Sequence, residues 1–240
     1  MKNTTLQKFF IVNFPRYSLL GFLLCVIAAM YLYPGGIYHY ELGIREACAE
    51  VCTKEGHHTE GYLFFKNFLS DLGRTISHGG HNNFHSSLLF NMALSFACLT
   101  YIIFFSFIKN LFPGKTIAKI GSLFGVCGAL SLFGVALTPA DLYLKPHIIA
   151  NHWIFRFFLL STIIYSWLIY QEDRVDNKYL IGNIIFIISL VTYILILMWG
   201  PMPTEPGGLE IQAVAQKIIM FNFVGSIFIQ TMAFNKMLKN

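Results

Sequence analysis

Residues 70–91 concentrate the side chains of this chain that suit acid–base and ligand chemistry. The segment reads SDLGRTISHGGHNNFHSSLLFN and places Asp71, Arg74, three histidines and several amides directly before a long apolar run. Polar groups at the mouth of a hydrophobic segment are costly unless something satisfies or uses them. A second such cluster, TPADLYLKPHIIANHWIFR, covers residues 138–156. We therefore predict a polar site that draws on both segments.

The histidines of the first cluster have metal-ligand spacing. His78, His81 and His85 stand at i, i+3 and i+7, and the last two are one helical turn apart, as in helices that hold zinc through two imidazoles. Gly79 and Gly80 argue against a helix that includes His78, and water-exposed histidines at a helix mouth are the alternative interpretation. A catalytic divalent metal such as zinc takes a third protein ligand and keeps an open position. The candidates for that ligand, which are also the candidates for catalysis beside His81 and His85, are Asp71, Asp141, His147 and His152.

The second cluster begins a helix that carries charge into the apolar region. His147 lies four residues before Asn151, and His152 lies four residues before Arg156, so each pair shares a helix face. A lipid-facing arginine at this depth costs about 2.5–3.5 kcal/mol, so the guanidinium of Arg156 should meet an acid or a phosphate. A structural ion pair and a bound ligand both remain open. The other residues of the candidate ligand-binding set are Arg74, Asn91, Gln216 and Lys217.

The five cysteines fall into two groups. Cys48 and Cys52 lie in a polar segment, where an oxidising compartment permits a disulfide, although a helical i, i+4 pair would have to distort to form one. A zinc site that combines both thiolates with His57 or His58 is the alternative. The remaining cysteines lie within apolar runs and are predicted to be small buried hydrophobic residues: Cys25, Cys98 and Cys127.

The composition indicates the class of protein. Of 240 residues, 55% are hydrophobic and only 12% are charged, whereas about a quarter of the residues in a soluble domain are charged. Runs of about 20 apolar residues, long enough to cross a bilayer, explain the deficit. The net charge of +5 does not indicate a nucleic-acid-binding protein, because the basic residues lie at the ends of apolar runs and not in one patch.

We predict an all-α integral membrane protein, with residues 1–240 forming a single six-transmembrane-helix bundle. The basic start before the first apolar run also fits a signal peptide, but no small-residue cleavage site follows it, so a retained helix is expected. Residues 35–77 form the extracytoplasmic loop, in which YLFFKNFLSDLG is expected to lie in the interface or pack over the helix mouths. The glycines of the third helix should allow close helix packing. The expected helices cover residues 17–33, 86–108, 117–137, 146–170, 179–199 and 214–234.

The distribution of basic residues predicts the orientation. Most Lys and Arg residues flank the helix ends that share a side with both termini, so the positive-inside rule places the termini in the cytoplasm. All eight histidines then lie on or near the opposite side, together with Asp71 and Asp141. The chain is expected in the cell (inner) membrane of a prokaryote, with its polar site facing away from the cytoplasm.

Short motifs of this chain resemble a known membrane family. They are SDLG at residues 70–73 before a helix with an early Asn91, Pro139-x-Asp141 with His147 downstream, and Gln216-Lys217 at the start of the last helix. With the six-helix layout, they resemble the domain of unknown function 998 family. That family is distantly similar to the Frag/DRAM/Sfk group of eukaryotic membrane proteins, some of which take part in lipid remodelling and lipid asymmetry. The resemblance implies a lipid-related role at the outer face and supplies no established catalytic residue.

Three classes of function remain open. The first is an enzyme that acts on an anionic lipid or lipid-linked headgroup through histidine and carboxylate chemistry, with or without a metal. The second is a transporter or lipid-translocating protein, and the third is a non-catalytic protein that binds a lipid or a partner. Because the ionisable residues crowd one side, we favour a one-sided site over a path through the membrane, and membrane lipids as its partners.

Overall fold

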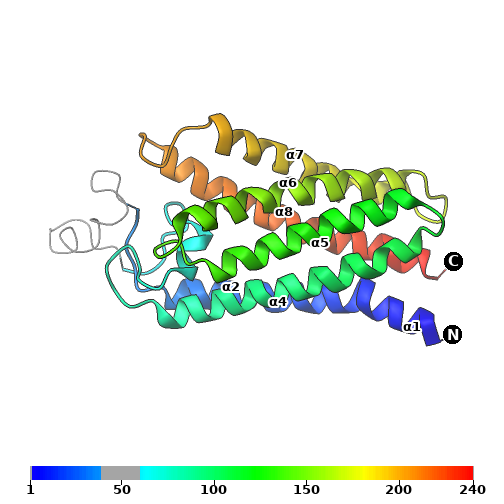
Figure 1. Ribbon diagram of the computed structural model, residues 1–240, viewed down its shortest axis with the longest axis horizontal. Coiled ribbons are helices and arrows are strands. Elements are labelled where there is room, and N and C mark those ends of the chain that lie inside the picture. Colours follow the sequence, from blue (N-terminus) through cyan, green and yellow to red (C-terminus); the bar gives the residue numbers. More distant parts are fainter. Residues whose placement is uncertain (1, 39–59, 240) are drawn as a thin grey trace.

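The computed structural model describes residues 2–38 and 60–239. Within these ranges the regular structure is helical, apart from isolated antiparallel bridges that pair Gly35 with Glu60 and Ile76 with Asn82. Six of the helices are long and apolar enough to cross a membrane. They form an elongated bundle, and the first and last described residues lie at the same end of it (Figure 1). We call this the terminal end, and we call the opposite end, where residues 60–83 lie, the loop end.

Each predicted helix coincides with one long helix of the structure. In chain order the elements are α1 (Lys2–Lys8), the π-helical η1 (Phe9–Asn13), α2 (Phe14–Leu32), the 3-10 helix η3 (Leu69–Gly73), α4 (Phe84–Ile108), η4 (Lys109–Leu111), α5 (Thr116–Leu137), α6 (Leu144–Tyr170), η5 (Asn177–Tyr179), α7 (Leu180–Trp199) and α8 (Gly208–Met237). The all-α, six-helix prediction is therefore confirmed for the described residues. The last helix begins six residues earlier than expected, because Glu210 is favourable in a first helical turn.

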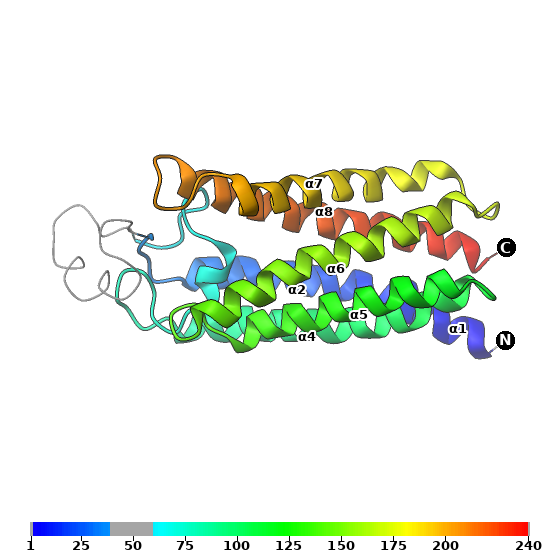
Figure 2. The ribbon, with the colours of Figure 1, turned by 45° about the horizontal axis from the view of Figure 1, so that its top comes forward.

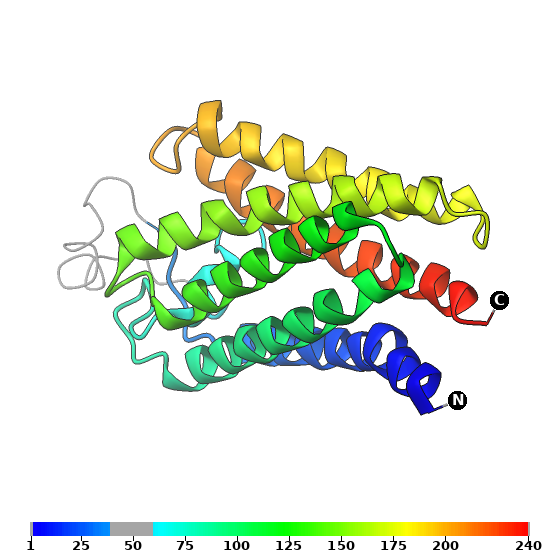
Figure 3. The same cartoon turned by 45° about the vertical axis from the view of Figure 1, so that its right-hand side comes forward.

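Helices that follow one another in sequence also pack against one another. The order of packing is α2, α4, α5, α6, α7 and α8, and a smaller contact between α2 and α8 closes the bundle. The helices run up and down in alternation, as short connections require, and two turned views show the long helices side by side along the bundle (Figures 2 and 3). Helix α5 lies between α4 and α6 in this arrangement.

The glycines of α5 allow this close packing. A Cβ on Gly125 would lie 2.3 Å from the ring of Phe105 on α4, and a Cβ on Gly121 would lie 2.8 Å from Ile164 on α6. Small residues at a helix contact let the backbones approach, which increases van der Waals contact where lipid removes the hydrophobic driving force. The packing role predicted for these glycines is confirmed.

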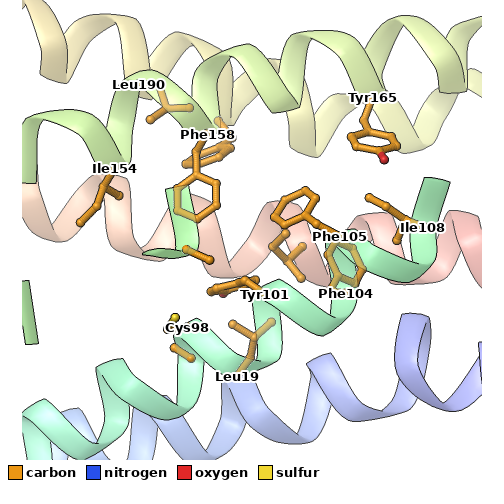
Figure 4. Close-up of a cluster of buried hydrophobic side chains, with 14 of the residues drawn as sticks. Leu19, Cys98, Tyr101, Phe104, Phe105, Ile108, Ile154, Phe158, Tyr165 and Leu190 are labelled. Atoms are coloured by element: carbon orange, nitrogen blue, oxygen red, sulfur yellow. The ribbon is translucent and has the colours of Figure 1, made fainter. Parts of the chain in front are cut away.

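Aromatic rings fill the bundle interior. The ring of Phe223 lies 5.0 Å from Tyr101, 4.8 Å from Phe158 and 5.1 Å from Phe186, which joins α4, α6, α7 and α8. Phe104 and Tyr165 continue the packing toward the terminal end (Figure 4). The terminal half is therefore densely packed. Cys98 is buried in this interior as predicted, whereas Cys25 and Cys127 are only partly buried.

A polar cluster joins three helices near the terminal end. Asn183 of α7 donates to the Ser166 hydroxyl of α6 at 3.0 Å, and its Oδ1 accepts from Gln230 and Ser226 of α8 at 2.8 and 3.1 Å. Polar residues that bond across helices hold a bundle together in lipid. Because these bonds satisfy the amide of Asn183, we assign the cluster a structural role, which the sequence did not reveal.

Candidate functional site

A buried segment, residues 67–76, covers the helix mouths at the loop end, and we call it the cap segment. It contains η3 and includes Asn67, Asp71 and Arg74, which are between 0% and 4% exposed. The Asn67 amide donates to Gly36 O at 2.8 Å, and its Oδ1 accepts from the backbone of Leu63 at 2.9 Å. The buried part of the cap segment therefore packs over the helix mouths, as the second alternative for YLFFKNFLSDLG anticipated, whereas Phe64 and Phe65 of that stretch are exposed.

Asn83, the residue before α4, holds the cap segment from one side. Its Nδ2 donates to the backbone oxygens of Asp71, Leu72 and Arg74 at 3.4, 3.1 and 2.9 Å. One side chain thus satisfies three buried carbonyls of a segment that lacks regular partners of its own. Buried backbone groups must find such partners.

Gln216 and Lys217 hold the cap segment from α8. The Gln216 Oε1 accepts from Leu69 N at 2.6 Å, and Lys217 Nζ donates to Asn67 O at 2.5 Å and to Ala213 O at 3.0 Å. Lys217 is only 1% exposed. Its ammonium lies 5.4 Å from the ring centroid of Tyr62, a favourable cation–π distance. Lys217 therefore anchors the cap segment, and the structure does not place it among the residues that line the cavity described below.

Asp71 and His78 form a buried pair. His78 Nε2 donates to Asp71 Oδ1 at 3.1 Å, and the two side chains are 7% and 6% exposed. Asp71 Oδ2 accepts from Phe68 N at 2.8 Å. Burial alone would raise the pKa of Asp71, but the attraction of His78 and Arg74 and the hydrogen bonds hold that pKa below its ordinary value. A carboxylate in this position fixes the orientation of the imidazole and its tautomer.

Asp141 secures the other end of the cap segment. Its carboxylate accepts from the backbone N–H groups of Thr75 and Ile76 and from the Thr75 hydroxyl. Partial burial raises the pKa of Asp141, but these hydrogen bonds, together with the nearby charge of Arg74, bring it below the ordinary value. Asp141 does not line the cavity, so it positions the segment that does.

Arg74 is a buried cation without a carboxylate partner among the described residues. Its residue exposure is 4%, and its Nε donates to Ile76 O at 3.1 Å. Among residues 2–38 and 60–239, its guanidinium forms no ion pair and no hydrogen bond other than this one. Both nearby carboxylates direct their oxygens to other donors. The guanidinium of Arg74 therefore keeps donors for a group that enters from the cavity.

A cavity of about 390 Å³ opens between the cap segment and the loop ends of α6, α7 and α8. His147 lines it, and its Nδ1 donates to Thr138 O at 2.6 Å. In a neutral imidazole this bond leaves Nε2 as an acceptor, and no described residue donates to it. The polar and titratable residues that line the cavity are Tyr38, Ser70, Asp71, Arg74, His78, His147, Asn151, His152, Tyr193, Gln212 and Gln216.

The structure brings together part of the predicted site. Asp71, Arg74, His147, His152 and Gln216 line the cavity. Asn91 lies behind the cap segment, where its amide donates to Gly73 O at 3.4 Å.

Arg156 departs from the predicted convergence. Its Nη1 donates to His152 O at 3.0 Å, and its guanidinium lies 5.9 Å from the ring centroid of Trp153, which is exposed. No acidic side chain of the described residues pairs with it. The long stem instead turns back along α6 toward the loop end.

The expected helical spacing of His81 and His85 is wrong. Helix α4 begins at Phe84, so His81 precedes it, and both histidines are exposed and outside the cavity. Gly80, which has φ of 78°, turns the chain before His81 in a conformation that other residues rarely adopt. Across the part of the chain that the structure describes, no group of three or more His, Cys, Asp or Glu is placed to hold a metal ion. The disulfide or zinc hypothesis for Cys48 and Cys52 concerns residues outside the described ranges.

Sequence reasoning missed the partners that build the site. His78 was considered only as a doubtful member of a histidine stripe, yet it pairs with Asp71, and Asn67 and Asn83 were not given roles in the site. An available signal was the density of asparagines beside the acids, because buried amides satisfy loops that lack regular hydrogen bonds.

The fold and the cavity define a bundle of six helices of membrane-spanning length, with a pocket at one end that is lined by Asp71, Arg74 and three histidines. Comparison of the chain with protein-family models, with curated proteins and with solved structures finds no match.

Proposed function

We propose that this chain is an integral membrane protein that binds an anionic headgroup, of a lipid or lipid-linked molecule, in the cavity at the loop end. The observation that carries the proposal is the buried guanidinium of Arg74, which lines the cavity and forms no direct ion pair with the nearby carboxylates of Asp71 and Asp141. A buried charge without a partner is costly. An arginine fork holds two oxygens of a phosphate or carboxylate at once, so an anionic ligand removes that cost.

The orientation proposed for the membrane follows the basic residues. Lys8, Lys109, Lys115 and Lys178 all lie on elements or connections at the terminal end. The positive-inside rule then supports cytoplasmic termini and a cavity that faces the outer leaflet.

Acid–base chemistry on the bound headgroup is the extension we propose. His78 is oriented by Asp71, and His147 is oriented by Thr138 O, so each imidazole has one nitrogen held and the other available. Two oriented imidazoles beside a cation are suited to proton transfer at a bound phosphate ester. The aromatic packing of Tyr101, Phe158 and Phe223 below the cavity favours a one-sided site over a transport path.

Membership in the domain of unknown function 998 family is a further part of this proposal. Four residues of its motifs share one structural task in this chain. Asn91, Asp141, Gln216 and Lys217 each bond to the cap segment that carries Asp71. A common task supports the interpretation of these short motifs as one pattern.

Binding measurements with matched arginine variants test the proposal. We expect Arg74→Gln to weaken the binding of inorganic phosphate and of anionic lipid by about 10- to 100-fold, the effect of losing a charge-assisted hydrogen bond. Arg156→Gln is the control, because it removes a cation on the same half of the bundle that does not line the cavity. Calorimetry with phosphate and mass spectrometry of copurified lipid give the two readouts. Unchanged binding in a folded Arg74→Gln protein would refute the proposal.

A further inference from the structure

A second cavity lies directly below the first one. It has a volume of about 120 Å³ and is lined mainly by apolar side chains from all six long helices. Ser70, Asn151 and Gln216 line both cavities, so the polar chamber and the apolar chamber share a wall at these three residues. The shared residues mark where polar lining gives way to apolar lining.

Aromatic rings limit the apolar cavity on the side of the terminal end. Tyr101 on α4, Phe158 on α6 and Phe186 on α7 line it, and they are the lining residues of their helices that lie farthest from the loop end. Phe223 of α8 contacts all three. Figure 4 shows Tyr101 and Phe158 directed into the space between the helices. A molecule in this chamber therefore meets a floor of packed rings.

A void of this size either holds a bound molecule or lowers the stability of the fold. Protein interiors are close-packed, and voids larger than a water molecule are few. An apolar cavity stays dry, and one of about 150 Å³ takes up a six-carbon hydrocarbon. The chamber described here has a similar size, and its polar neighbour holds the buried cation Arg74. The two chambers together have the chemistry of an amphiphile, charged at one end and apolar at the other.

We propose that the apolar chamber binds the first carbons of a hydrocarbon chain whose anionic headgroup lies at Arg74. The inference rests on the proposed function and names its ligand class: an anionic amphiphile with at least one unbranched or isoprenoid chain, bound with its headgroup toward the loop end and its chain in the apolar chamber. The ring floor limits the length of chain that gains contacts to about six carbons, since that is what a cavity of this size accommodates. Any longer chain continues outside the chamber.

The test is a chain-length series measured on the full-length protein in lipid nanodiscs. The probes are inorganic phosphate and butyl, hexyl and dodecyl phosphate, with alkyltrimethylammonium ions of equal chain length as controls for partition into the bilayer. We expect affinity to rise by about fourfold per buried methylene, which corresponds to about 0.8 kcal/mol, and to level off beyond hexyl phosphate. The cationic series should show no saturable binding.

Filling the chamber provides the matched variants. Ala97 lines it and Ala93, one turn away on α4, lines neither chamber, although both are 5% exposed. With Ala97→Leu, the affinity for hexyl phosphate should fall to about that for inorganic phosphate, whereas Ala93→Leu should retain the chain-length dependence. Leu132 lines the chamber from α5, and its side chain is only partly buried. If Ala97→Leu does not fold, Leu132→Phe is the alternative variant that fills the chamber.

The outcomes separate the two proposals. Binding of phosphate with no dependence on chain length, or a dependence that Ala97→Leu and Leu132→Phe leave intact, overturns the chain site and leaves the headgroup site standing. Absence of saturable binding of phosphate and of every alkyl phosphate overturns the proposed function itself. Chain-length dependence that survives Arg74→Gln would show a chain site without the headgroup contact and would also overturn the inference.

Discussion

Asp141 and Thr75 are joined by hydrogen bonds from the Thr75 backbone N–H and hydroxyl to the Asp141 carboxylate, across 66 residues of sequence. The neighbouring Ile76 N–H donates to the same carboxylate at 2.9 Å. Because Arg74 directly precedes Thr75, these bonds fix the backbone that presents its guanidinium to the cavity. Asp141 is therefore a positioning residue for the proposed anion site.

The Asp141→Ala variant should show this coupling. Loss of the charge-assisted bonds should lower the free energy of unfolding by about 2–3 kcal/mol, and phosphate binding should weaken because Arg74 is less fixed. Asp141→Asn keeps an acceptor oxygen and should lie between wild type and Asp141→Ala in both measurements. Thermal unfolding and phosphate titration are the checks. A destabilised Asp141→Ala protein with wild-type phosphate affinity would assign Asp141 a purely structural role.

Acid should destabilise the loop end through Asp71. Its pKa in the folded protein is below the ordinary value of 3.8 because His78, Arg74 and hydrogen bonds outweigh the effect of burial. The stability from this group is therefore fully present above about pH 4, the unfolded pKa, and is lost as the pH falls through the depressed folded pKa. Asp71→Asn should be less stable than wild type at neutral pH and should lose less stability on acidification. Unfolding curves between neutral pH and pH 3 measure this; equal slopes in the two proteins would contradict it.

The fold was predictable because it depends on features that sequence displays directly. Apolar runs of bilayer length separate short polar connections, and the packing glycines of α5 stand out within one of them. The first helix was the least well bounded, because helical structure continues back through the charged residue Lys8 to residue 2. Polarity predicts where a helix leaves the membrane, and a helix itself often continues beyond that point.

The site was predicted in part, for a physical reason. Asp71, Arg74 and His147 were identified by the cost of placing polar groups at helix mouths, and they do line one cavity. The roles of Arg74 and Lys217 were not separable from sequence, because both are single cations in apolar surroundings. Backbone carbonyls of Asn67 and Ala213 both accept from the Lys217 ammonium, whereas the Arg74 guanidinium donates only to Ile76 O among the described residues. The direction in which a carbonyl points depends on the loop conformation, and the spacing of residues in the sequence does not predict that conformation.

Lys217→Met should separate anchoring from ligand binding. The variant keeps a long apolar stem but removes the ammonium that donates to Asn67 O and Ala213 O, so we expect a loss of about 1–3 kcal/mol of stability from the lost charge-assisted hydrogen bonds, although the Tyr62 hydroxyl still donates to Asn67 O. Amide hydrogen exchange should increase in residues 62–69. Phosphate affinity should fall far less than in Arg74→Gln. Loss of phosphate binding without faster exchange would instead place the ammonium at the ligand.

Replacing glycine by alanine should change the stability of the bundle differently at two glycines that lie in helices. Gly125→Ala places a Cβ 2.3 Å from the Phe105 ring, an overpacking that should destabilise the bundle by about 1–3 kcal/mol. Gly225 in α8 has nothing within 4 Å of such a Cβ, so Gly225→Ala should be neutral or stabilising by up to about 1 kcal/mol through helix propensity. Thermal unfolding in one detergent compares them. Equal effects would refute the close α4–α5 contact.

The proposed orientation is tested by cysteine labelling in intact cells. Glu60→Cys, in a background whose native cysteines are replaced by serine, places one exposed thiol at the loop end, beside the bridge to Gly35. Lys239→Cys places an exposed thiol at the terminal end. Because the positive-inside rule puts the basic terminal end in the cytoplasm, a membrane-impermeant maleimide should label Glu60→Cys directly and Lys239→Cys only after permeabilisation. The reverse pattern would turn the cavity toward the cytoplasm, and the anionic ligand would then have to be sought in the inner leaflet.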